Sequence, residues 1–265
     1  MHSSVLAAID LGPSSRRVLY HAAGFARLLS ARLRVIYVTA DPTTEERQRV
    51  ADFCSQNGPY EVEITPDDVI VRGGRVSDTI YREAIHDKAK VVVMGSRGHS
   101  GLARLLLGSS TESVLRNAPS PVLLVPPTDL DIVNLSDRAS LTCGPVLAAI
   151  DLAETSEHQL ALASSLADIA GQGLLLMTVA SQALTEQAAT VMLRQRAHEL
   201  ADGHKPHALI VRRGDIAEEI SRCAVTEGAG LVVMGLRARP RGHPGLIAAE
   251  VLKTKRAFVL AVPGA

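Results

Sequence analysis

One stretch of this chain, between Val91 and Glu112, combines residue types whose spacing suits the binding of an anion. The residues that matter are three of its glycines and the three hydroxyl side chains directly after the last of them: Gly95, Gly98, Gly108, Ser109, Ser110 and Thr111. Glycine lets a backbone approach a ligand closely and adopt positive φ. The first amides of a helix are unpaired donors at the positive end of its dipole. A loop that leaves a strand through glycines and enters a helix through hydroxyls therefore predicts a site for phosphate.

The spacing of these residues resembles that of a known family. The apolar run Val91–Met94 has the pattern of a buried strand, and the pattern Gly-x2-Gly-x9-Gly-Ser follows it directly. This pattern is similar to the nucleotide-binding loop of the universal stress proteins, and it is far more specific than a lone pair of glycines. The resemblance implies that the loop holds the phosphates and the ribose of ATP. Mg²⁺ could accompany the phosphates.

A second group of candidate residues lies near the N-terminus. Asp10 ends the first predicted strand and precedes Leu11 and Gly12. Ligands of open parallel sheets bind beyond the carboxyl ends of the strands, so Asp10 would face the glycine loop if the first and fourth strands are neighbours. The resemblance implies that they are, and it places Asp10 near the adenine and ribose. It also places Val38, at the end of the second strand, where the backbone meets adenine.

The complete predicted nucleotide site joins these two groups and adds one cation of the loop. Its members are Asp10, Leu11, Gly12, Val38, Met94, Gly95, Arg97, Gly98, Gly108, Ser109, Ser110 and Thr111. No residue is assigned to catalysis or to metal binding. No carboxylate lies between Gly95 and Glu112, so a base that would activate water on a γ-phosphate is not evident. Fast hydrolysis is therefore not predicted.

Several of these residues have simpler explanations. The run from Ser109 to Glu112 spells a capping box, in which Ser109 would cap the helix and not bind phosphate. Asp10 could be a turn residue and Val38 a core residue. Arg97, and with it the other cations of the loop, could be solvated surface charges.

The chain repeats itself at a distance of a whole domain. Val5–Gly12 returns as Val146–Ala153 with seven of eight positions identical, at an offset of about 140 residues. The offset falls to 137 between Val122 and Val259, so the second copy has a shorter glycine loop. A period of this length indicates duplication of a domain and not a solenoid.

The second copy has lost most of the phosphate-binding pattern. Asp151 and Gly235 remain, but Ala238 stands where Gly98 would be, and Gly245 is followed by Leu246 and Ile247 in place of the serines. Residues 237–241 of its loop contain three arginines and a proline, and the arginines could still attract an anion. The resemblance no longer supports an ATP site there, so this half is predicted to be structural or regulatory.

Alternating apolar runs and helical patterns predict the fold. In the first copy strands are expected near 4–9, 33–39, 68–72, 90–94 and 121–125, and helices near 14–30, 43–56, 76–87 and 109–117, with Ser14 and Ser15 as caps of the first helix. The segment 60–64 stays open between strand and hairpin. Such alternation predicts an α/β fold of two tandem doubly wound domains, each with about five mainly parallel strands. The resemblance implies the adenine nucleotide alpha-hydrolase-like variety. The prolines that end the strand at 121–125, and the polar residues after them, predict domains at 1–127 and 144–265 and a linker at 128–143.

Composition limits the classes of function. Lys plus Arg and Asp plus Glu number 28 each and aromatic residues are 3%, which argues against a nucleic-acid-binding protein. No apolar run is long enough to cross a bilayer, and the N-terminus lacks a signal-peptide pattern. Cys54, Cys143 and Cys223 are widely spaced and are expected to be buried apolar residues. A cytoplasmic protein follows as the expectation.

The function expected from these observations is that of a cytoplasmic tandem universal stress protein. Its first domain would bind ATP, and binding would regulate partners in a stress response. The alternatives are a nucleotide-independent scaffold with a structural glycine loop, and a slow ATPase. The resemblance further implies a pseudo-dimer of the two domains, for which the strands at 122–125 and 259–262 are candidates, and a homodimer of chains is a weaker hypothesis.

Overall fold

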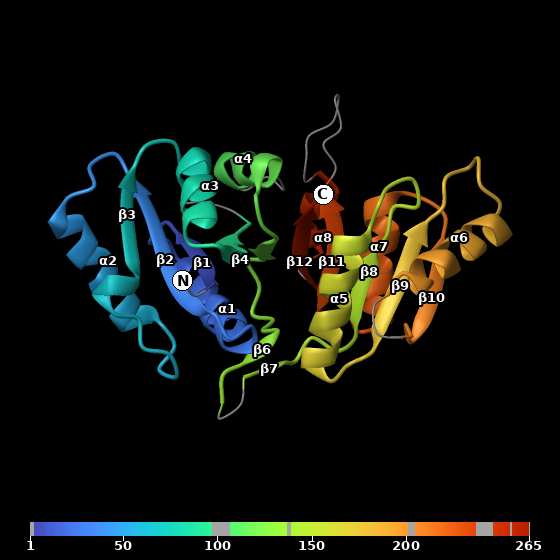
Figure 1. Cartoon of the computed structure of the whole chain (residues 1–265), viewed down its shortest axis with the longest axis horizontal. Helices are drawn as coiled ribbons and strands as arrows, with labels where there is room; N and C mark the ends of the chain where they lie inside the picture. The colour runs from blue at the N-terminus through green and yellow to red at the C-terminus, as the bar shows by residue number, and fades with distance from the viewer. Residues whose placement is uncertain are drawn as a thin grey trace. The chain divides into compact units, whose positions relative to one another are not determined.

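Strands and helices alternate along the chain in a computed structural model, which describes residues 3–96, 107–136, 139–200, 205–236, 246–254 and 256–264. The chain divides into two units. The first comprises Met1–Pro127 and Val133–Ser140, and the second comprises Thr128–Ile132 and Leu141–Ala265. In Figure 1 the first unit runs from blue to green and the second from yellow to red.

The first unit contains five parallel strands in the order β5-β4-β1-β2-β3. Its elements are β1 (Ser4–Ile9), α1 (Ser15–Leu28), β2 (Arg32–Thr39), α2 (Thr44–Asn57), the 3-10 turn η1 (Pro66–Asp68), β3 (Val69–Gly73), α3 (Val76–His86), β4 (Ala89–Gly95), α4 (Ser109–Asn117) and β5 (Val122–Val125). Helix α1 contacts α2, and α3 contacts α4. The crossovers through α1 and α2 run toward β3, and those through α3 and α4 run toward β5, so right-handed connections place the two pairs on opposite faces of the sheet. This arrangement confirms the predicted doubly wound fold.

Two local predictions in this unit are settled by the structure. Ser14 occupies the N-cap position of α1 but makes no side-chain cap bond, so its expected role as a cap is wrong. The hydroxyl of Ser15 is also unavailable as a cap, because it bonds the carboxylate of Asp10. The segment 60–64 forms turns and irregular backbone, and it is not a strand.

The second unit repeats the same layout, with parallel strands in the order β10-β9-β8-β11-β12. Its elements are β8 (Val146–Ala149), α5 (Glu157–Ala170), β9 (Leu174–Val179), α6 (Glu186–His198), β10 (Ala208–Arg212), α7 (Ile216–Thr226), β11 (Leu231–Leu236), α8 (Leu246–Lys253) and β12 (Phe258–Pro263). The central strands are almost wholly buried, as expected for parallel strands covered on both faces. Among the described residues no helix has the length and apolar character that a membrane crossing requires.

The segment that follows β5 is ordered by contacts with α1. It holds two short strands, β6 (Val133–Asn134) and β7 (Ser140–Leu141), which pair with each other. The hydroxyl of Tyr20 donates to the carbonyl of Val133 at 3.3 Å, and a guanidinium nitrogen of Arg27 donates to the carbonyl of Leu135 at 2.9 Å. A side chain on Gly24 would come within 2.8 Å of Val133, so this glycine allows the close approach of the two segments.

All three cysteines are buried and none is in a disulfide, as the sequence predicts. Burial raises the pKa of Cys54 to about 12 and the pKa values of Cys143 and Cys223 to about 11. A thiol reacts through its thiolate, so the folded protein should release almost no chromophore from 5,5′-dithiobis(2-nitrobenzoate) at pH 8, whereas denatured protein releases three equivalents. A thiol that reacts within seconds in the folded protein would contradict this burial.

Candidate functional site

The order of strands reverses between β1 and β4, and this reversal defines the first candidate site. The chain proceeds from β1 to β2 and β3 on one side, while β4 and β5 lie on the other. Ala8 pairs with Met94 at the carboxyl ends of the two strands. The predicted adjacency of the first and fourth strands is therefore confirmed. Ligands of doubly wound sheets bind outside the carboxyl ends at such a reversal.

The turn after β1 is held by the carboxylate of Asp10. Its Oδ1 accepts the backbone N–H of Gly12 at 2.9 Å and the hydroxyl of Ser15 at 3.0 Å. The backbone N–H of Asp10 in turn donates to the Ser15 hydroxyl at 3.3 Å. Leu11, between them, has a φ of 59°, a left-handed conformation that is uncommon for residues other than glycine. Strained backbone of this kind tends to occur at functional sites, where surrounding bonds hold it in place.

A backbone hydrogen bond joins the two ends of the glycine loop. The backbone N–H of Gly108 donates to the carbonyl of Ser96 at 3.1 Å, and the N–H of Ser96 donates to Val125 in β5 at 3.1 Å. The hydroxyl of Thr111 donates to the carbonyl of Gly95 at 3.1 Å. These bonds fasten the first turn of α4 to the end of β4, beside the turn that holds Asp10.

The start of α4 corrects one reading of the sequence. The helix begins at Ser109 with Gly108 as its N-cap and without a side-chain cap bond, so the capping box from Ser109 to Glu112 is wrong. The first bond along the helix runs from the N–H of Glu112 to the carbonyl of Gly108 at 2.9 Å. The amides of Ser109, Ser110 and Thr111 precede that bond and are the donors that a helix leaves unpaired.

The hydroxyl groups of this first turn differ in their surroundings. Ser109 and Ser110 are exposed, whereas Thr111 is buried and its hydroxyl already donates to Gly95. The two serines and the amides can therefore reach an anion, and Thr111 positions the helix. Arg97 and Gly98 of the predicted site, and also His99 and Arg104, lie outside the described residues.

The remaining predicted residues lie on adjacent strands. Met94 is buried near the end of β4, and Val38 is half-buried near the end of β2, which pairs with β1. The structure thus brings most of the predicted residues together at the carboxyl ends of the strands. Sequence reasoning missed Ser15 and Ser96, which fix the two loops. The only feature of the sequence that could have pointed to these serines is their place, because each comes one or a few residues after the end of a strand.

The second unit has the same turn without the same clamp. The N–H of Ala153 donates to Oδ1 of Asp151 at 3.0 Å, as Gly12 does for Asp10. Ser156 is the counterpart of Ser15, yet its buried hydroxyl has no hydrogen-bond partner among the described residues. Helix α8 begins at Leu246, so apolar residues replace serines at its start. The predicted loop residues 237–241 lie outside the described part of the chain.

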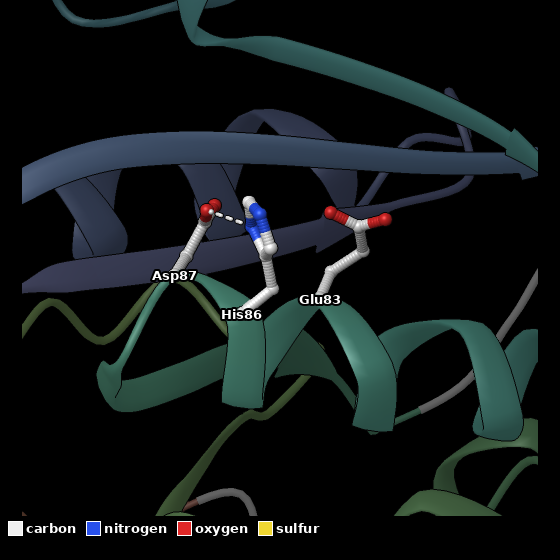
Figure 2. Close-up of side chains that lie close together, drawn as sticks. All are labelled: Glu83, His86 and Asp87. Atoms are coloured by element: carbon white, nitrogen blue, oxygen red, sulfur yellow. Dashed lines mark hydrogen bonds and ion pairs between the residues drawn. The ribbon is translucent and has the colours of Figure 1, made fainter.

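Three side chains near the C-terminal end of α3 resemble a metal-binding group. Glu83, His86 and Asp87 offer ligand atoms within 4.8 Å of one another, and Figure 2 shows the hydrogen bond between His86 and Asp87. Both carboxylates already form ion pairs with arginines. Arg72 lies 2.7 Å from Glu83, and Arg34 lies 3.2 Å from Asp87. These ion pairs account for the cluster, and we assign no metal to it.

Comparisons with known proteins agree with this geometry. Residues 1–126 match the family model described as the universal stress protein family. One relative is the Thermus aquaticus protein named "Universal stress protein in QAH/OAS sulfhydrylase 3′region". It is 30% identical over 136 residues, which cover 47% of this chain and 99% of that protein. Universal stress protein Slr1230 of Synechocystis sp. is 29% identical over 121 residues, covering 46% of this chain and 42% of that protein.

A solved structure extends the likeness to both units. A universal stress protein from Archaeoglobus fulgidus DSM 4304 superposes with a TM-score of 0.70 and covers 98% of each chain. The sequences are only 20% identical, so this likeness concerns the fold alone.

Proposed function

This chain belongs to the universal stress protein family, and from that premise we propose that its first unit binds ATP. The protein would act as a tandem member of the family in the cytoplasm. This compartment suits its three free thiols. Binding would change its conformation or its choice of partner in a stress response. Turnover of the nucleotide is not part of this proposal.

The observation that carries the proposal is the attachment of α4 to the end of β4. Bonds from Gly108 to Ser96 and from Thr111 to Gly95 hold the unpaired amides of α4 at the strand reversal. A helix start with exposed hydroxyls is a set of donors that fits phosphate. No rearrangement of the helix is needed for these donors to face an anion, because the bonds already fix it.

The residues take two kinds of role in this proposal. Asp10 and Val38 would hold the nucleoside, with Leu11, Gly12 and Met94 beside it. The residues around the phosphates would be Gly95, Arg97, Gly98, Gly108, Ser109 and Ser110, with Thr111 as their support. Mg²⁺ would be held by the phosphates themselves, since no protein ligand for it is assigned.

A matched pair of variants tests which unit binds the nucleotide. Calorimetry should find one ATP per chain of the natural protein. Asp10→Ala should weaken binding about tenfold to a hundredfold, because a lost hydrogen bond to a charged group costs about 1.5–3 kcal/mol. Asp151→Ala removes the same turn bond from the second unit, from Ala153, and should leave ATP affinity unchanged.

The same titration separates the alternatives. Asp10→Asn keeps an acceptor for Gly12 and Ser15, so a loss of affinity in that variant cannot be assigned to a collapsed turn. Flat calorimetry and no adenine absorbance in the purified protein would favour the nucleotide-independent scaffold. Phosphate release above that of Asp10→Ala would favour a slow ATPase.

We also propose that the units form a pseudo-dimer within the chain through β5 and β12. Support comes from the strands themselves: each is an edge in the strand order of its own unit, and each is almost entirely apolar. An uncovered apolar edge strand invites aggregation. Fast hydrogen exchange, in the intact protein, at the β5 amides that point away from β4 would contradict this pairing. A further homodimer of chains would be dismissed by a monomer mass in light scattering.

A further inference from the structure

The second unit contains a cavity of about 820 Å³ at the carboxyl ends of β8, β9 and β11. This volume lies within the range of sites that bind drug-sized molecules. The strand order reverses between β8 and β11, as it does between β1 and β4. The cavity therefore occupies the place where the first unit is proposed to hold its nucleotide, although the sequence of this half has lost the phosphate-binding pattern.

Most of the lining consists of apolar side chains that come from every layer around the cavity. These side chains belong to Ile150, Leu152, Met177, Val179, Leu184, Ile216, Ile220, Met234, Leu236 and Ile247. Several of them are partly exposed, including Val179, Leu236 and Ile247, and Ile216 is 40% exposed. Partly exposed apolar side chains around a concave surface gain free energy when a ligand removes them from water.

The start of α8 shows why this cavity does not suit phosphate. Ile247 stands where α4 has Ser110, and Ala248 where α4 has Thr111, and both line the cavity. Neither can donate a hydrogen bond from its side chain. The charged residues of the described lining are two carboxylates, Asp151 and Glu154, and one guanidinium, Arg213, so there is no excess of positive charge for a polyanion.

Two polar features of the lining set a limit on how apolar the ligand can be. The side-chain amide nitrogen of Gln159 donates to the carbonyls of Ala149 and Val233 at 2.8 and 3.0 Å, so its carbonyl oxygen, beside Gly235 in the lining, is left as an acceptor. Arg213 spans the rim, where it donates to the carbonyls of Ser181 and Leu184. A ligand with one hydrogen-bond donor could satisfy the Gln159 oxygen while its body fills the apolar part of the cavity.

We propose that the second unit is a binding site for an uncharged, largely apolar organic molecule with a single hydrogen-bonding group and no phosphate. The two units would then bind different chemical classes at equivalent positions. The duplicated scaffold keeps the crevice, and the side chains at the start of the last helix decide between phosphate and hydrocarbon.

N-phenyl-1-naphthylamine is a suitable probe, because it is uncharged, carries one N–H and fluoresces strongly only in apolar surroundings. Titration into the intact protein should show one saturable site per chain. Val179→Trp fills the cavity and should weaken probe binding at least tenfold. Val38→Trp places the same side chain at the equivalent position of the first unit and should leave probe binding unchanged while it impairs ATP binding.

Several outcomes would overturn the proposal. Equal probe affinity in the natural protein and Val179→Trp would do so, as would absence of saturable binding. If Val179→Trp fails to fold by circular dichroism, Ile216→Gln at the exposed rim replaces it, with an expected loss of about threefold or more. Displacement of the probe by ATP in the Asp10→Ala variant, whose first unit binds ATP weakly, would show that the cavity of the second unit takes an anion. Failure of ATP to bind the first unit would leave the probe result unaffected.

Discussion

Replacing Ser109 and Ser110 together by aspartate should lower ATP affinity at least a hundredfold and at the same time stabilise the fold. Both serines are exposed in the first turn of α4. A carboxylate about 5 Å from a phosphate costs about 3 kcal/mol at an effective dielectric constant of about 20. Because about 1.4 kcal/mol corresponds to a tenfold change in affinity, even one such repulsion accounts for the expected loss.

The gain in stability has a separate cause. Acidic residues in the first turn of a helix interact favourably with its dipole, by about 0.3–1 kcal/mol each. The double variant should therefore unfold at a slightly higher temperature than the natural protein. Most variants that damage a binding site do so by weakening the fold, so opposite changes in stability and affinity would locate the effect in the site itself.

The matched control is the double asparagine variant, which has nearly the same shape as the aspartate variant and no charge. Its ATP affinity should stay within about tenfold of the natural protein. The deficit of the aspartate variant should also shrink as salt concentration rises, because salt screens exposed charges. If the aspartate and asparagine variants bind ATP equally well, the phosphates do not lie at the start of α4 and the proposed site is incorrect.

The sequence predicts local elements better than it predicts side-chain roles. The bounds of α4 agree with the helical pattern at 109–117, and the buried parallel strands agree with apolar runs. The adjacency of β1 and β4 came from the family resemblance, since pairing of parallel strands far apart in sequence leaves no periodic signal. The tandem arrangement follows from the repeat itself, which needs no structural knowledge.

Side-chain roles were mistaken where one motif permits two outcomes. The run from Ser109 to Glu112 satisfies the capping-box pattern, but Gly108 takes the N-cap position, and a glycine cap has no side chain to signal it. Ser15 was expected to cap α1 and instead bonds Asp10, a choice that depends on how the turn folds. The cavity of the second unit was not predicted, because the sequence shows only that the phosphate-binding residues are lost. Whether the vacated crevice collapses or stays open depends on packing among distant side chains.

The second unit offers the largest expected change in stability at a single glycine. Gly144, just before β8, has a φ of 64°, and a Cβ there would come within 2.4 Å of the carbonyl oxygen of Gly228. Gly144→Ala must both hold a left-handed conformation, at about 1–2 kcal/mol, and push a backbone carbonyl away. We expect this variant to lose about 3 kcal/mol or more of the free energy of unfolding of the second unit, measured by urea denaturation.

The chain supplies a control for the conformational part of that cost. Gly171, which ends α5, has a φ of 60°, and a Cβ there would meet nothing within 4 Å. Gly171→Ala should therefore cost only about 1–2 kcal/mol, the cost of a left-handed alanine. The difference between the two variants isolates the clash with Gly228.

The same variant connects stability to the two binding sites. Gly144 leads into β8, whose carboxyl end forms part of the apolar cavity, so loss of that strand should abolish binding of N-phenyl-1-naphthylamine. ATP binding belongs to the other unit and should persist at urea concentrations where the probe no longer binds. Equal destabilisation by Gly144→Ala and Gly171→Ala would mean that the carbonyl of Gly228 moves aside freely. Loss of both ligands at one urea concentration would mean that the units unfold as one, and the two sites would then share a single free energy of unfolding.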